Sequence, residues 1–101
     1  MWILVMFDLP VGNKQERKAA HDFRLALLDL GFEMAQFSVY LRFCSSHAQC
    51  ATQCRYVEAA LPVGGRVSVL QFTDKQYERT VTFSGRKPQK KIEAPPQYVL
   101  F

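Results

Sequence analysis

Residues 1–10 read MWILVMFDLP. The first seven residues of this stretch are apolar and rich in β-branched and aromatic side chains, which is typical of a strand buried at the centre of a sheet. Asp8 ends the run, and Pro10 cannot continue a central strand because it has no backbone N–H to donate. The run is too short for a membrane span, and no basic residues precede it as they would in a signal peptide.

A helix is predicted directly after this strand, over residues 13–30. Asn13 and Glu16 have the spacing of a capping box, and Gly31 is a typical C-terminal stop. Apolar residues recur at helical spacing along one side, which identifies the face that packs on the sheet. The residues expected on that face are Ala20, Phe23, Leu27 and Leu30.

The next segments complete an α+β pattern. Residues 32–41 alternate between two sets of side chains and predict a strand, and a capping box at Ser46 begins a helix that runs to about residue 61. Further strands are expected over residues 67–72 and 80–83, with one helical turn at Thr73 between them. We interpret this order as strand, helix, strand, strand, helix, strand, the βαββαβ arrangement of ferredoxin-like folds.

That fold has a definite consequence for assembly. Right-handed crossovers place both helices on one face of an antiparallel sheet and leave the other face uncovered. In a chain of 101 residues, which is enough for one domain, an exposed apolar sheet face is expected to bind a partner, and we predict a homodimer.

The end of the chain differs in composition. Residues 85–96 are basic and Pro-rich and predict an extended linker. We therefore divide the chain into a ferredoxin-like domain, residues 1–84, and a basic tail, residues 85–101. The tail ends in an apolar, strand-like patch that is expected to contact the second protomer or another partner: Tyr98, Val99, Leu100 and Phe101.

Cysteine usage indicates a reducing compartment. The chain has three cysteines and no signal peptide, so free thiols in the cytoplasm are expected. Cys44, Cys50 and Cys54, together with His47, have a spacing that would also be compatible with zinc. Structural zinc usually takes ligand pairs from two separate elements, however, and small buried thiols on a helix are the favoured interpretation.

Basic residues follow one stripe of the first helix. The net charge is +4, which permits an anionic partner without requiring one. At 100° per residue these cations lie opposite Phe23 and Leu27, where they either bind nucleic-acid phosphates or form a solvated face. The predicted nucleic-acid-binding residues are Lys14, Arg17, Lys18 and Arg24, extended by Arg42 and Arg66.

Asp8 is the candidate catalytic and metal-binding residue. A carboxylate at the end of a buried strand and before a Pro turn is placed to face a cleft, and Mg²⁺ prefers one or two carboxylates with water and phosphate oxygens. In a two-fold dimer, two Asp8 carboxylates could share one ion. Alternatively, Asp8 caps the turn through the local backbone, and the residues alone leave both interpretations open.

Several segments in the same order resemble the CRISPR-associated family Cas two (Cas2), in the short version found in type II systems. They include MWILVMFDLP at residues 1–10, QFSVYLR at 36–42 and GRVSVL at 65–70, with shorter matches at 17–20, 31–32, 73–76 and 87–90. The resemblance covers the whole chain. It implies a symmetric homodimer that bridges two dimers of the CRISPR integrase, Cas one (Cas1), and holds the short double-stranded DNA inserted into the CRISPR array.

The resemblance also implies a metal-dependent nuclease. Members of the family are described as Mg²⁺-dependent endoribonucleases, and the aspartate at the end of their first strand corresponds to Asp8. The sequence thus predicts a cytoplasmic DNA-binding scaffold that binds no membrane, with RNA as a further candidate ligand. The alternative is a free-standing, toxin-like metal-dependent ribonuclease. An RNA-recognition module is disfavoured, because residues 65–70 lack the stacking aromatics expected there.

Overall fold

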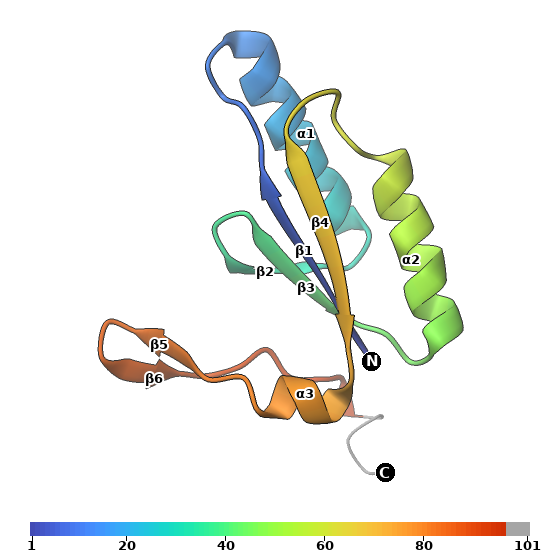
Figure 1. Ribbon diagram of the computed structural model, residues 1–101, viewed down its shortest axis with the longest axis vertical. Coiled ribbons are helices and arrows are strands. Elements are labelled where there is room, and N and C mark those ends of the chain that lie inside the picture. Colours follow the sequence, from blue (N-terminus) through green and yellow to red (C-terminus); the bar gives the residue numbers. More distant parts are fainter. Residues whose placement is uncertain (97–101) are drawn as a thin grey trace.

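Strand β1 (Trp2–Asp8) lies in the middle of a four-stranded antiparallel sheet with the order β2-β3-β1-β4 in the computed structural model, which describes residues 1–96 (Figure 1). Its neighbours are β3 (Val39–Phe43) and β4 (Arg66–Phe72), and β2 (Glu33–Gln36) forms the far edge. The central position predicted for the first strand is confirmed. The predicted apolar patch at residues 98–101 lies outside the described residues.

Two helices cover one face of this sheet. They are α1 (Lys14–Asp29) and α2 (His47–Ala59), which lie side by side along the sheet in Figure 1. Alternate residues of β1 enter the core between sheet and helices, where they meet Phe23 and Leu27 of α1 and Val57 of α2. The two-layer α+β architecture of a ferredoxin-like fold is therefore confirmed.

The single strand predicted over residues 32–41 is wrong, because the chain turns back within it. Strands β2 and β3 form a hairpin whose turn contains Phe37, 90% exposed, and Ser38, with a φ of 61°. The alternation of side chains continues through the turn, and neither Gly, Pro nor Asn marks it. This hairpin supplies the second and third strands of the βαββαβ order, and β4 is the fourth.

The strand predicted at residues 80–83 lies outside the main sheet. After α3 (Asp74–Glu78), β5 (Thr82–Ser84) pairs with β6 (Lys87–Gln89) in a separate two-stranded hairpin. The extended linker predicted for residues 85–96 is thus wrong for the residues of β6. Gly85 makes the turn with a φ of 65°, a left-handed conformation that favours glycine.

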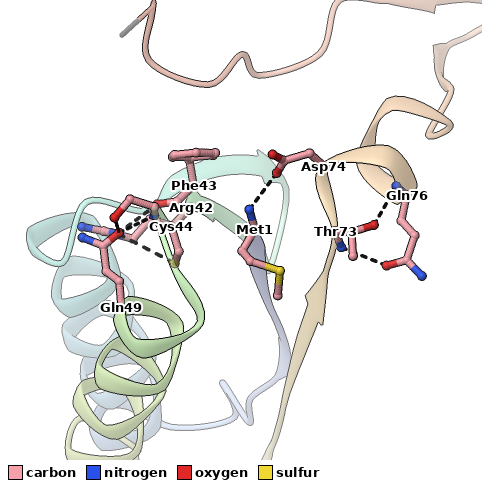
Figure 2. A network of polar contacts seen from close by, with 9 residues as sticks. Met1, Arg42, Phe43, Cys44, Gln49, Thr73, Asp74 and Gln76 are labelled. Carbon is pink, nitrogen blue, oxygen red and sulfur yellow. Dashed lines mark hydrogen bonds and ion pairs between the residues drawn. The ribbon is translucent and has the colours of Figure 1, made fainter. Parts of the chain in front are cut away.

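Helix capping follows the predicted residues with one change of partner. The Asn13 side chain accepts a hydrogen bond from the backbone N–H of Glu16, and Thr73 forms a complete capping box with Gln76 (Figure 2). At α2, Ser46 accepts from the N–H of Gln49 as expected. The Gln49 side chain, however, accepts from the backbone N–H of Ser45, one residue before the cap, at 2.6 Å.

Within residues 1–96, none of the helices combines the length and the apolar character needed to span a bilayer.

Candidate nucleic-acid interface

The face of the sheet opposite the helices is partly open. Leu4, Met6 and Asp8 alternate along β1 with the buried Ile3, Val5 and Phe7 and therefore point away from the core. Their register partners on β4 are Leu70, Ser68 and Arg66. Met6 is 46% exposed and Leu70 is 44% exposed, so apolar side chains at the centre of this face remain in contact with solvent.

The other end of the same face is closed by α3. The ring of Tyr77 lies on Trp2 with a centroid distance of 4.1 Å, and Phe43 contacts Trp2 edge-on at 5.4 Å. The N-terminal amine of Met1 also lies 2.7 Å from the Asp74 carboxylate at the first residue of α3 (Figure 2). The open part of the face is therefore the half that contains Met6 and Asp8.

Asp8 is exposed at the end of β1, as the sequence predicts, and its neighbour on β4 is Arg66. Paired residues of an antiparallel ladder point to the same face, so the carboxylate and the guanidinium share one end of the open face. Gly65 makes this approach possible. With a φ of 87°, it lies so close to β1 that an added Cβ would be 2.7 Å from the Asp8 carbonyl oxygen.

One chain does not provide a complete Mg²⁺ site. In the part of the chain that the structure describes, no three His, Cys, Asp or Glu side chains gather where they could hold a metal ion. The side chain beside Asp8 is a cation rather than a second carboxylate. A magnesium ion at Asp8 would therefore need oxygen ligands from a second chain or from a nucleic acid.

The cations of α1 differ in how freely they can contact phosphate. Lys14 and Arg17 are exposed, and across residues 1–96 neither lies within 4 Å of an acidic group. Lys18 is paired with Asp22 at 2.8 Å, and its hydrogen bond to this carboxylate raises the pKa of the Lys18 ammonium. Arg24 is half-buried. The best-placed cations of the predicted stripe are thus the two at its N-terminal end.

Arg42 has a structural role that the sequence did not indicate. Its Nε donates to the carbonyl oxygen of Leu30 at the C-terminus of α1, at 2.8 Å, and its Nη1 donates to the carbonyl of Phe43 at 2.9 Å. Figure 2 shows this side chain turned toward Cys44 and Gln49. Arg42 therefore satisfies an unpaired carbonyl at the helix end, and its predicted contact with DNA stays a prediction.

The cysteines are packed into the core at α2. Cys44 and Cys50 are fully buried, as expected for small thiols, and Cys54 is partly buried beside the Gln71 side-chain amide. Burial, followed by the hydrogen bond to Cys44, raises the pKa of Cys50 to about 12. A thiol with such a pKa stays protonated and apolar, which fits a packing role.

Comparison with known proteins agrees with this architecture. The chain matches the family described as CRISPR associated protein Cas2 over residues 1–80. It is 64% identical over 101 residues to the CRISPR-associated endoribonuclease Cas2 of Paracidovorax avenae, across all of this chain and 94% of that protein. It is 44% identical to the protein of the same name from Flavobacterium psychrophilum, across all of this chain and 88% of that one.

A third relative, from Parvibaculum lavamentivorans, is 40% identical and is matched along its full length. The fold and these matches define a CRISPR-associated protein with a ferredoxin-like domain. The chain belongs to the Cas2 family.

Proposed function

We propose that this chain is the dimeric, DNA-binding scaffold subunit of a CRISPR spacer-acquisition complex. In this role it works in the cytoplasm with the Cas1 integrase and holds a short DNA duplex. The observation that carries the proposal is the open half of the sheet face, where half-exposed apolar residues lie beside a cationic end of the molecule.

The open face supports dimerisation. Met6 and Leu70 belong to adjacent strands and are both close to half exposed. A second copy related by a two-fold axis would cover these side chains with the same side chains, and burial of apolar area is the main driving force of such association. The integrase would then meet two identical surfaces.

The cations support contact with a duplex. α1 begins six residues after Asp8, so Lys14 and Arg17 lie at the same end of the sheet as Arg66 (Figure 1). Lysine and arginine side chains at one end of the molecule can bind phosphates without reading base sequence. A scaffold for DNA of arbitrary sequence requires that kind of contact.

The experiment is a duplex-binding series with the Lys14→Ala, Arg17→Ala double variant. Each lost phosphate contact lowers the slope of log affinity against log salt by about one, so a loss of roughly two to four is expected if both protomers contribute. Fluorescence anisotropy over a salt series measures this slope, for the dimer alone and with the integrase. Unrelated duplex sequences should show the same change.

A matched control removes the same charge elsewhere. Arg55 on α2 and Lys75 on α3 are both exposed, and the Arg55→Ala, Lys75→Ala variant should bind duplex like the wild type. A Lys14→Ala, Arg17→Ala variant with an unchanged slope, alone and with the integrase, would show that the stripe on α1 is only a solvated face.

A second candidate function is a metal-dependent nuclease, with RNA or DNA as substrate. It is favoured by the exposure of Asp8 on the face proposed for dimerisation, which would place two Asp8 carboxylates in one assembly. The relatives are named endoribonucleases. Asp8→Asn should then abolish Mg²⁺-dependent cleavage and leave the dimer intact. Cleavage by this variant at the wild-type rate, in protein free of contaminating nuclease, would exclude Asp8. Efficient cleavage without the integrase would favour the free-standing ribonuclease.

A further inference from the structure

The β5–β6 hairpin forms a cationic projection from the main sheet. In Figure 1 it extends away from the four-stranded sheet, on the far side of the molecule from the start of α1. Residues 79–92 contain five basic residues and no acidic residue. The five are Arg79, Arg86, Lys87, Lys90 and Lys91.

The tip of the hairpin is open to solvent. Gly85 and Arg86 form the turn, and an added Cβ at Gly85 would meet no atom within 4 Å. Arg86 and Lys87 are both exposed. Among the residues that the structure places, no acidic group lies within 4 Å of either cation, so both charges are available to an anionic ligand.

The base of the hairpin, in contrast, is held to the body. The Tyr77 hydroxyl donates to the Ile92 carbonyl, and Lys91 Nζ donates to the carbonyl of Glu78. Thr82 and Gln89 line a cleft of about 220 Å³ on the open side of the sheet, so the face of the hairpin that carries them turns toward the sheet. An anchored base with an exposed cationic tip is suited to present charge at a fixed position.

We propose that Arg86 and Lys87 bind the phosphodiester backbone of a nucleic acid, as a contact surface separate from α1. The inference rests on the proposed function and extends it. α1 begins beyond the end of β1, whereas the hairpin follows α3, which packs on Trp2 at the other end. Seven residues of β1 separate these ends, or about 20 Å at 3.3 Å per residue. The same nucleic acid can therefore be held at two points, which fixes its direction as well as its distance.

A protein ligand is the competing occupant of the hairpin. The face opposite Thr82 carries Phe83, whose register partner is Pro88, and Phe83 is 60% exposed. Val81 is 64% exposed. Four of the five cations in the segment are exposed, and a dense positive charge without acidic partners favours phosphates over an apolar protein surface. The charge at the tip therefore decides between the two occupants.

The test is the Arg86→Ala, Lys87→Ala variant in anisotropy titrations with a duplex and with a single strand of the same sequence. We expect the slope of log affinity against log salt to fall by roughly two to four for the dimer, with unchanged far-ultraviolet circular dichroism. The Arg55→Ala, Lys75→Ala variant is the matched control and should keep the wild-type slope. The two nucleic acids show whether the backbone is bound in paired or unpaired form, and a fall with either one supports the proposal.

Failure of this inference can be told apart from failure of the proposed function. Wild-type protein that binds neither nucleic acid would overturn both. Wild-type binding with an unchanged slope in the Arg86→Ala, Lys87→Ala variant would overturn only the role of the hairpin. A Val81→Ser, Phe83→Ser variant that loses dimer mass in sedimentation, with the cation variant binding normally, would assign the hairpin to a protein interface instead.

Discussion

The two faces of the four-stranded sheet are built from alternate residues of the same strands, yet their surroundings differ. On β1, Ile3 and Val5 are 0% exposed beneath the helices, whereas Met6, between Val5 and Phe7, is 46% exposed. The apolar character of residues 1–7 therefore exceeds what the helices of one chain can cover. The surplus lies on the face where we propose that a second copy binds.

The largest expected effect is on the covered face. Leu27 is 0% exposed in the core, and Leu27→Ala should lower the free energy of unfolding by about 2–5 kcal/mol, because it removes buried methyl groups and leaves a cavity. Leu28, on the same helix, is 48% exposed, and Leu28→Ala should cost about 0.5 kcal/mol or less. Urea unfolding at fixed protein concentration measures both, and equal losses would contradict the assignment of the core face.

The open face should respond in mass rather than in fold. In the Met6→Lys, Leu70→Lys variant, we expect a folded monomer in sedimentation, because four charges would meet at the two-fold interface. The control is Leu25→Lys. Leu25 is 45% exposed on α1, as apolar and as exposed as the other two but on the opposite side, and its variant should remain a dimer. Retention of the dimer by the double variant would show that association uses another surface.

A smaller effect is expected where the C-terminal segment is fastened across the open face. Tyr77→Phe keeps the ring on Trp2 and removes only the hydrogen bond to the Ile92 carbonyl, a loss of about 0.5–1.5 kcal/mol. Trypsin cleavage after Lys90 should accelerate about 2- to 10-fold. Tyr56 is 51% exposed on α2, and Tyr56→Phe should not change the cleavage rate. The same rate in Tyr77→Phe would mean that the hydroxyl does not hold the segment.

The smallest effect concerns pH. The pKa of Cys50 is about 12 in the folded chain against an ordinary value of 9.0, because the thiol is buried. The unfolded chain ionises first as pH rises, so the stability linked to this thiol is complete below about pH 9 and is lost progressively toward pH 12. Urea unfolding at pH 8 and at about pH 10.5 should show a smaller decrease for Cys50→Ala than for the wild type. Identical decreases would mean that Cys50 ionises as readily in the folded chain.

The elements that the sequence predicted well are those with local signals. Three capping residues and a continuous apolar run located α1, α2, α3 and β1. The β2–β3 turn was missed because Phe37 and Ser38 carry no turn signal and because alternation of side chains continues through them. β6 was missed because basic, Pro-containing sequence is typical of linkers, whereas Gly85 supplies a turn that lets Lys87 pair with Ser84.

The candidate site divides in the same way. Exposure of Asp8 at the end of β1 follows from its place after the apolar run. Its neighbour Arg66 does not, because the register between residues 8 and 66 depends on how two distant strands pair. Arg42 was predicted as a phosphate contact, but its bond to the Leu30 carbonyl depends on where α1 ends relative to β3. Sequence patterns identify side chains, whereas their partners are set by tertiary packing.

The central position of β1 has a consequence for the order of folding. Trp2 pairs with Phe72, so the strand that is translated first acquires its β4 neighbour only after residues 66–72 have left the ribosome. Contacts of such long sequence separation form late, because loop closure precedes any gain from pairing. The β2–β3 hairpin and α1 can assemble on β1 earlier. During synthesis, β1 therefore has one unpaired edge until β4 arrives, and a nascent chain stalled before residue 66 would expose that edge to aggregation.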